Sequence, residues 1–117
     1  MEHTFVNFTN HPSDKWEEMQ RQCAAEYGEI VDLPFPEVEA EADETVINEM
    51  ADLYVRRILD LQPGAVLCQG EFTLVFQVAS MLKAQGITVL AACSKREVKE
   101  YGNKKEVTFQ FVRFRRY

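Results

Sequence analysis

The 117-residue sequence lacks the patterns of several well-defined protein classes. It has no uncharged apolar run approaching the roughly 18 residues of a membrane span, and its first residues lack the basic stretch of a secretory leader. Its three cysteines are widely spaced and include no Cys-x-x-Cys pair, so the pattern favours reduced thiols over a disulfide framework or a zinc site. We therefore expect a cytoplasmic protein with no membrane association.

Motifs of well-known chemistries are missing as well. The chain contains no Walker loop, no Gly-x-Ser-x-Gly elbow and no Gly-x-Gly-x-x-Gly dinucleotide fingerprint. It also shows no internal repeat and no low-complexity linker. A chain of this length with 46% hydrophobic residues has the apolar material for one core. We expect a single domain over residues 1–117 that needs neither a metal nor a cofactor.

The charge is unevenly distributed along the chain, whose formal net charge is −6. Residues 95–117 carry 8 basic and 3 acidic side chains, whereas residues 1–94 carry 5 basic and 16 acidic ones. The acidic body disfavours general binding to duplex nucleic acid. The basic tail favours either a small anion such as a nucleotide, or pairing with acidic helices of the same or a neighbouring subunit.

Short apolar strands alternate with segments of helical periodicity. Strands are predicted at residues 3–8, 29–33, 65–68 and 87–92, and helices at about 14–27, 43–61 and 72–84. Apolar residues around Gly102-Asn103 then predict a terminal antiparallel hairpin. From Val112 the apolar side of the last strand switches, which indicates a bulge or the end of core packing.

This order of elements predicts the α/β class, with a three-layer, Rossmann-like, mainly parallel sheet and a C-terminal antiparallel hairpin. If the first and third strands are neighbours, as in the strand order 2-1-3-4, the topological switch of the sheet lies between them. The loops that follow these two strands then face each other. The sequence therefore predicts a ligand crevice at the carboxyl edge of the sheet.

The first loop of this crevice reads Asn10-His11-Pro12-Ser13. Asn10 either contacts a ligand or makes a local turn, and Ser13 is a second candidate ligand contact that is also expected to cap the following helix. Free histidine side chains titrate near neutrality, which makes His11 a candidate for proton transfer. It is a candidate general acid, general base or phosphate donor, or else a hydrogen-bonding loop residue.

The second loop reads Gln69-Gly70-Glu71-Phe72-Thr73. Gly70 lets the backbone approach a ligand, and the Thr73 hydroxyl lies near free helix amides, a combination that suits an anion. The alternative is a tight turn with Thr73 as an internal cap. Glu71 is a candidate catalytic base, an acceptor for a ribose hydroxyl, or an ion-pair partner of a nearby cation.

A third polar segment, Cys93-Ser94-Lys95-Arg96, follows the strand predicted at residues 87–92. We expect it to open onto the same edge of the sheet. There Arg96 would contact phosphate through two hydrogen bonds and Lys95 would act as a point charge. Either side chain could instead hold the hairpin or pair with Glu71.

The Rossmann-like element order, the polar loop at residues 10–13, the Gly70-x-x-Thr73 turn and the terminal hairpin resemble the CARF superfamily of CRISPR-associated sensors. Members bind cyclic oligoadenylates across a dimer axis, and some cleave them as ring nucleases with an RNA 2′-hydroxyl as nucleophile. The resemblance implies a homodimer whose ligand contacts are Asn10, His11, Ser13, Gly70 and Thr73, with Lys95 or Arg96 near phosphate. The missing effector domain favours a stand-alone ring nuclease or a ligand sink.

Three functions are left open by these residues. The first is binding of a nucleotide-type anion by a homodimer, which the resemblance narrows to a cyclic oligoadenylate sensor or ring nuclease. The second is a small nucleoside- or nucleotide-processing enzyme that uses Glu71 and His11. The third is a non-catalytic dimeric interaction module that binds a partner through its hairpin or second helix. Convergence of the polar loops in a deep pocket would disfavour the third.

Overall fold

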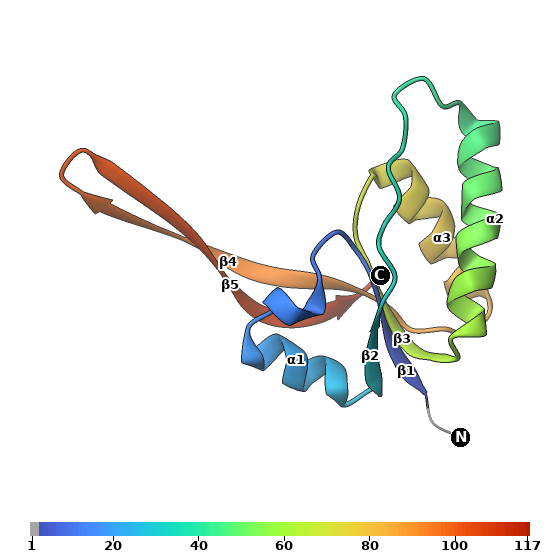
Figure 1. Cartoon of the computed structure of the whole chain (residues 1–117), viewed down its shortest axis with the longest axis horizontal. Coiled ribbons are helices and arrows are strands. Elements are labelled where there is room, and N and C mark those ends of the chain that lie inside the picture. The colour runs from blue at the N-terminus through green and yellow to red at the C-terminus, as the bar shows by residue number, and fades with distance from the viewer. Residues whose placement is uncertain (1–2) are drawn as a thin grey trace.

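The computed structural model describes residues 3–117 and contains one five-stranded sheet with helices packed on both of its faces (Figure 1). The elements in chain order are β1 (Thr4–Phe8), the 3-10 helix η1 (Ser13–Lys15), α1 (Glu18–Ala25), β2 (Glu29–Asp32), α2 (Glu44–Asp60), β3 (Pro63–Cys68), α3 (Phe72–Ala84), β4 (Val89–Tyr101) and β5 (Lys104–Arg116). The α/β class and the mostly parallel sheet with its antiparallel C-terminal hairpin are confirmed.

The strands lie in the order β2-β1-β3-β4-β5. β1 pairs in parallel with β2 and β3, β3 pairs in parallel with β4, and β5 runs antiparallel to β4. The chain therefore leaves β1 toward one edge of the sheet and then returns past it toward the other. This confirms that the first and third strands are neighbours, and the topological switch lies between them.

Alternate strand residues face two separate apolar clusters, because successive side chains of a strand point to opposite faces. One cluster lies beside α1 and contains Phe5, Trp16, Ala24, Ala65, Leu67 and Leu90. The other lies under α2 and α3, and its strand residues are Val6, Phe8, Val66, Cys68 and Val89. At the carboxyl ends of the strands, the face beside α1 is the one on which the candidate site lies.

The helix predicted over residues 14–27 is wrong as a single element, because it is divided into η1 and α1. Trp16 and Glu17 between the two have extended backbones, each with ψ of 152°. The Trp16 ring packs edge-on against Phe5, with 6.1 Å between ring centroids, and its Nε1 donates to the His11 carbonyl at 3.0 Å. These contacts hold the indole in the core, and the backbone leaves the helical path there.

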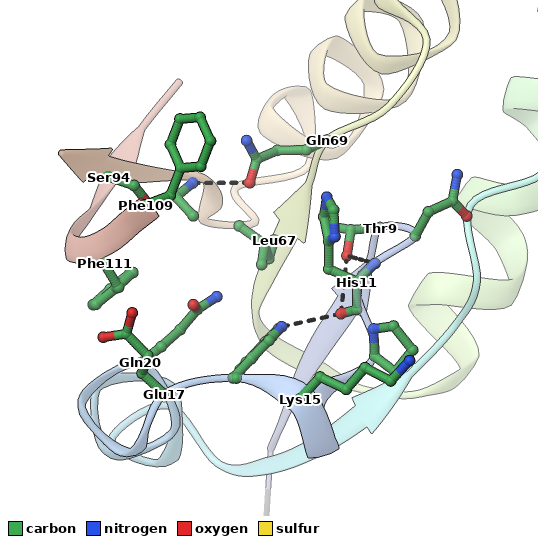
Figure 2. Close-up of a pocket in the computed structure, with 14 residues that line it drawn as sticks. Thr9, His11, Lys15, Glu17, Gln20, Leu67, Gln69, Ser94, Phe109 and Phe111 are labelled. Carbon is green, nitrogen blue, oxygen red and sulfur yellow. Dashed lines mark hydrogen bonds between the residues drawn. The ribbon is translucent and has the colours of Figure 1, made fainter. Parts of the chain in front are cut away.

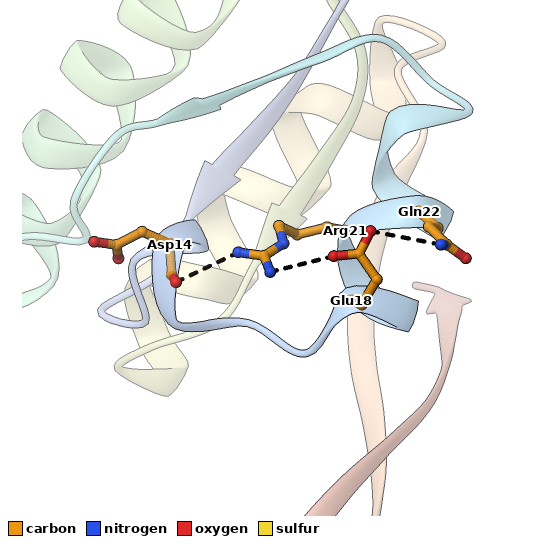
Figure 3. Close-up of polar contacts among 4 residues, drawn as sticks. All are labelled: Asp14, Glu18, Arg21 and Gln22. Carbon is orange, nitrogen blue, oxygen red and sulfur yellow. Dashed lines mark hydrogen bonds and ion pairs between the residues drawn. The ribbon is translucent and has the colours of Figure 1, made fainter.

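Arg21 joins the two pieces of this interrupted helix at the surface (Figure 3). Its guanidinium donates to the Asp14 carbonyl of η1 at 3.4 Å and pairs with the Glu18 carboxylate of α1 at 3.3 Å. Because the groups are exposed, these contacts contribute little to stability, and the Trp16 contacts dominate.

The separate strand predicted at residues 87–92 is also wrong in extent. β4 continues without a break for 13 residues to Tyr101, and β5 pairs with it up to a turn at Gly102, where φ is +57°. The segment after Ala92 is mostly polar, with Val98 and Tyr101 as its large apolar residues, and its sequence shows no alternation that marks this extension. Because β4 is continuous, the expected third junction is absent, and Lys95 and Arg96 lie inside β4.

A bulge in β5 explains the change of phase at Val112. Cys93 pairs with Arg113 whereas the next residue, Ser94, pairs with Phe111, so Val112 is the extra residue on β5. This confirms the bulge interpretation. As a result Phe111 and Phe114, three residues apart, lie on the same face of the sheet with 4.9 Å between ring centroids.

The other two helices agree with their predicted ranges. α3 has the predicted bounds, and α2 begins after Asp43, whose side chain accepts a hydrogen bond from the Val46 amide at 3.1 Å. Within residues 3–117, none of the helices is long and apolar enough to cross a membrane.

The turn between α1 and β2 should be intolerant of a side chain at Gly28. This residue has φ of +143°, and an added Cβ would lie 2.0 Å from the His3 carbonyl oxygen. Gly86 is the matched control, because its φ is also positive, at +80°, but an added Cβ would meet nothing within 4 Å. We expect Gly86→Ala to lower the free energy of unfolding by about 1–2 kcal/mol and Gly28→Ala to lower it by more than about 3 kcal/mol. Equal losses in urea denaturation would contradict this account of the turn.

Candidate functional site

A recess of about 600 Å³ opens at the carboxyl edge of the sheet, on the face that α1 covers (Figure 2). Its sheet side is formed by three pairs of residues, each pair two positions apart: Leu67 of β3 and Gln69 just after it, Ala92 and Ser94 of β4, and Phe109 and Phe111 of β5. Its other side is formed by the loop at residues 9–12 and by Lys15, Trp16, Glu17 and Gln20. The loops that leave β1 and β3 thus meet around one recess.

The loop after β1 is held by a buried amide, that of Asn7, whose side chain is 1% exposed. Its Nδ2 donates to the His11 carbonyl and to Asp32 Oδ1, both at 2.9 Å, and its Oδ1 accepts from the Thr9 hydroxyl at 2.8 Å. Because each polar atom of this amide has a partner, its burial carries no unsatisfied polar group. The network joins β1, β2 and the loop in one arrangement.

Both backbone polar groups of His11, its carbonyl and its amide, form hydrogen bonds with side chains. Its carbonyl accepts from Asn7 Nδ2 and from Trp16 Nε1, and its amide donates to the Thr9 hydroxyl at 3.1 Å. The imidazole itself is exposed and lies on the wall of the recess (Figure 2). The neighbouring Asn10 is exposed and also lines the recess. Both predicted residues therefore lie at the recess, and hydrogen bonds fix the backbone of His11.

Ser13 does not cap a helix, contrary to the prediction. The cap position of η1 belongs to Pro12, and Ser13 directs its hydroxyl to Asp32 Oδ2 at 3.1 Å. Its backbone amide also approaches both oxygens of Asp32 at 3.3 Å. The Asp32 carboxylate, at the end of β2, thus accepts hydrogen bonds from the amide and the hydroxyl of Ser13. Ser13 does not line the recess.

Gln69 presents a second amide to the recess, at the exit of β3. Its Oε1 accepts a hydrogen bond from the Ala92 amide of β4 at 3.1 Å (Figure 2). This bond fixes the orientation of the side chain and uses its oxygen, so the amide nitrogen is left as a hydrogen-bond donor. Gln69 is half-buried, so a ligand in the recess would meet this donor close to the sheet.

Aromatic surface makes up much of the apolar lining. Trp16 is 7% exposed and Phe111 is 3% exposed, so both are anchored in the core. Phe109 lines the same recess but is 66% exposed, because it lies on the part of β5 that has left the body of the sheet. An aromatic ring with an open face is a stacking platform for a planar ligand.

The recess contains few charges. Lys15 and Glu17 line its helical side, and its remaining polar side chains, apart from the His11 imidazole, carry amides and hydroxyls. Lys15 and His11 are the groups available to an anionic part of a ligand, and Glu17 is available to a hydroxyl or an amine. Within residues 3–117, no group of three His, Cys, Asp or Glu side chains is placed to hold a metal ion.

Glu71 caps α3. Its carboxylate accepts hydrogen bonds from the Thr73 hydroxyl, the Thr73 amide and the Leu74 amide, the last at 3.0 Å. The bond from the Thr73 side chain is the main cause that lowers the pKa of Glu71 below its ordinary value, and it outweighs the opposing effect of burial. A carboxylate held in this way is a weaker base than a free one, and neither Glu71 nor Thr73 lines the recess.

Gly70 serves packing between the loop after β3 and the chain after β2. An added Cβ would lie 2.6 Å from ring atoms of Phe35, which is 5% exposed. The absence of a side chain therefore lets Phe35 cover the loop. Gly70 is not among the residues that line the recess.

Lys95 and Arg96 lie on the hairpin, opposite Gln110 and Phe109. Neither lines the recess, whose contribution from this part of β4 is Ser94. Within residues 3–117 the ion pair that forms joins Arg21 and Glu18, so neither cation pairs with Glu71. Of the eight candidate residues, the structure brings Asn10 and His11 together at the recess.

The sequence interpretation missed most of the lining, but part of it had a signal. Gln69 is the first residue after a buried strand, the position at which a ligand crevice begins. Asn7 is a polar residue in the apolar run of β1 and lies on the same face of the strand as Phe5. Strand alternation therefore predicts that its side chain is buried. The lining from Lys15 to Gln20 depends on the break at Trp16, for which the sequence holds no plain signal.

Cys68 lies under this edge of the sheet and takes no part in the recess. Its side chain is buried, and burial raises the pKa of the thiol to about 12. The thiol therefore stays protonated at neutral pH and is a poor nucleophile. Its carbonyl accepts a hydrogen bond of 2.6 Å from the Tyr117 hydroxyl, which holds the end of the chain against the sheet.

In a comparison with protein families, a family model described as "Uncharacterized protein MJ1673 family" matches residues 3–115. No curated protein matches the chain, and no solved structure matches it.

Asn7→Ala tests the network that holds the loop. The variant removes three hydrogen bonds, those from Asn7 Nδ2 to Asp32 and to the His11 carbonyl and that from the Thr9 hydroxyl to Asn7 Oδ1, so we expect the free energy of unfolding to fall by about 2–3 kcal/mol. Asn48→Ala, on the exposed side of α2, is the control and should change it by less than about 0.5 kcal/mol. Both are measured by chemical denaturation. A similar small change in both variants would show that the network does not hold the loop.

Glu71→Gln tests the helix cap through its pH dependence. Since the folded-state pKa of Glu71 is lowered, the ionised cap stabilises the fold above the ordinary pKa of 4.5, and this contribution is lost as pH falls through the lowered value. The wild type should therefore exceed the variant in stability at neutral pH, with the difference shrinking in acid. Glu49→Gln removes a carboxylate from the middle of α2 and is the matched control. The same pH profile for both variants would contradict the cap.

Proposed function

The chain belongs to the MJ1673 family, whose description names no activity, and we propose from the geometry of the recess that the protein binds a small nucleotide-type anion. The observation that carries the proposal is the position of the recess. It lies where the exits of β1 and β3 meet, at the topological switch of the sheet, which is the usual ligand position in open α/β sheets.

The chemistry of the lining supports a ligand with a planar ring and polar edges. Phe109 offers an open aromatic face on which a base would stack. Gln69 and Gln20 supply amide groups for the edge of a base or for a ribose hydroxyl. Amide side chains can both donate and accept, so they suit the mixed donors and acceptors of a nucleobase.

The phosphate of the ligand is assigned to the loop side of the recess. Lys15 would contact it as a point charge, and His11 would donate a hydrogen bond from a backbone that is already held. A volume of about 600 Å³ is within the usual range for small-molecule and cofactor sites. Asn10 lies beside His11 and adds a further amide at the mouth.

The resemblance to the CARF superfamily makes the proposal more specific. It includes a three-layer, Rossmann-like arrangement, a homodimer and a cyclic oligoadenylate as the ligand, which the protein would sense or cleave as a ring nuclease. The neighbouring exits of β1 and β3 support it, whereas the positions of Ser13, Gly70, Thr73, Lys95 and Arg96 outside the recess do not. The cytoplasmic location stays a prediction of the sequence.

An enzyme that uses Glu71 as its base is not favoured. Glu71 accepts three hydrogen bonds as the cap of α3, and its lowered pKa weakens it as a base. The His11 imidazole lies at the recess and takes no part in this cap, so any proton transfer to a bound ligand is assigned to it.

Isothermal titration with adenosine monophosphate, cyclic tetra-adenylate and cyclic hexa-adenylate tests this function. We expect binding of at least one of the three, and a loss of about 5- to 150-fold in affinity for Phe109→Ala, since stacking one base on an aromatic ring is worth about 1–3 kcal/mol. Phe76→Ala is the matched control, because Phe76 is 68% exposed against 66% for Phe109 but lies on α3, away from the recess.

The outcomes separate the parts of the proposal. Binding of the monophosphate without either cyclic ligand would remove the CARF-specific part and leave a general nucleotide site. No binding of any of the three ligands would overturn the function. Equal loss in the Phe109 and Phe76 variants would move the ligand away from the recess.

A further inference from the structure

The end of the β4–β5 hairpin leaves the body of the protein as an arm, formed by residues 94–111 (Figure 1). β3 pairs with β4 only through Val66 and Leu67, near the start of β4. In the part of the chain that the structure describes, the strands of the arm pair with each other alone. Since a lone two-stranded ribbon is marginally stable in water, the arm lacks the support that a third strand or a helix would provide.

The two faces of the arm differ in polarity. Directly opposed residues of antiparallel strands share a face, so the rows Arg96 and Phe109, Val98 and Val107, and Glu100 and Lys105 form one face, which we call the arm face. Val98 and Val107 are each 40% exposed and Phe109 is 66% exposed. The opposite face is polar apart from Tyr101, and its rows are Lys95 and Gln110, Glu97 and Thr108, Lys99 and Glu106, and Tyr101 and Lys104.

The arm face is continuous with the recess. Phe109 belongs to both, and Ser94 and Phe111 at the base of the arm line the recess as well. An uncovered apolar surface of this kind, flanked by charges, is typical of an interaction site. The charges on it identify the partner.

The charges of the arm face are self-complementary. Along β4 the order is Arg96, Val98, Glu100, with opposite charges on either side of the central valine. A two-fold axis through the row of Val98 and Val107 places Arg96 over Glu100 of the partner subunit and Phe109 over Lys105 of the partner subunit. The first is an ion pair and the second a cation–π contact, and each occurs twice because the interface is isologous.

We propose that a second copy of this chain covers the arm face, with the two arms stacked face to face and antiparallel. The apolar rows then bury one another, and opposite charges meet on either side of them. Antiparallel stacking also places the two bodies at opposite ends, whereas parallel stacking would bring together the α1 layers that lie on this same side of the sheet. This interface does not depend on the identity of the ligand.

The same axis brings the partner to the recess. Ser94 and Gly102 are equidistant from Val98 along β4, and Phe111 and Asn103 are equidistant from Val107 along β5. The partner's Gly102 and Asn103 therefore lie over Ser94 and Phe111, at the edge of the recess. Each recess would gain a wall from the other subunit, beside the partner's basic residues Lys104 and Lys105.

Charge reversal on the arm face tests the interface by sedimentation equilibrium at up to about 100 µM, a range that reports micromolar dissociation constants. The wild type should dimerise. In the homodimer of Arg96→Glu two carboxylates face each other at each charge contact, and in the homodimer of Glu100→Arg two guanidinium groups do. Each substitution should therefore weaken dimerisation by at least about tenfold. Lys95→Glu, one residue along on the opposite face, is the matched control and should dimerise as the wild type does.

An equimolar mixture of the Arg96→Glu and Glu100→Arg variants provides the decisive comparison. In the mixed dimer every charge contact is again between opposite signs, so a heterodimer should form at wild-type affinity, resolved by native mass spectrometry. Parallel stacking would not give this rescue, because position 96 would then face Phe109 of the partner. Circular dichroism checks that each variant is folded, and charge substitution at these exposed positions should leave the fold intact.

Three results would overturn the proposal. They are a wild type that stays monomeric throughout the concentration range, a dimer that neither arm-face variant weakens, and a mixture that forms no heterodimer. Since none of these measurements includes a nucleotide, failure of the interface and failure of the proposed function are distinguishable.

Discussion

The buried side chain of Asn7 is the interaction on which the candidate site depends. An amide at 1% exposure must find partners for its donors and its acceptor, and it finds them in Asp32, the His11 carbonyl and the Thr9 hydroxyl. These groups belong to the neighbouring strand β2 and to the loop after β1. Because the buried amide of this one strand residue needs hydrogen-bond partners, it holds the backbone of His11 at the topological switch.

The opposite side of the recess follows from strand alternation and from one extra residue. Leu67 lies near the end of β3 and Gln69 follows its last residue, two positions on, while Ala92 and Ser94 lie two apart on β4, so each pair lies on the same side of the sheet. On β5 the bulge at Val112 restores this phase and keeps Phe111 on the side of Phe114. Without it, Phe111 would face away from the recess, and the aromatic surface would stop at the body of the sheet.

The fold could be predicted largely from the sequence because it depends on local signals. The apolar run at residues 65–68 and the Pro63-Gly64 pair with which β3 begins mark a buried strand, and α3 has the expected bounds because Gly86 ends its periodicity. The site was predicted only in part. Asn10 and His11 are at the recess because they follow β1 directly, but Ser13, Glu71 and Gly70 find partners in Asp32, Thr73 and Phe35. Asp32 and Phe35 are distant in sequence from Ser13 and Gly70, and Glu71 accepts the Thr73 donors that a ligand was expected to use. Propensity and spacing predict neither kind of contact.

The arm, too, could be predicted from the sequence only in part. The apolar residues around Gly102-Asn103 predict a hairpin, but this pattern alone does not tell how far the strands run beyond the sheet. Length matters here, because residues 94–111 carry the apolar rows away from the body and leave them uncovered. The arm face and the recess share Phe109, so the proposed assembly and the proposed ligand binding would use one continuous surface.

The central claim is that the ligand lies where β1 and β3 end, and amide chemical-shift mapping by NMR with cyclic tetra-adenylate and adenosine monophosphate tests it most directly. The account predicts that the perturbed amides gather at residues 9–17, at Gln69, at residues 92–94 and at residues 109–111. Perturbations centred on the amino edge of the sheet, at residues 25–29 and Gln62, or no perturbation with either ligand, would contradict it.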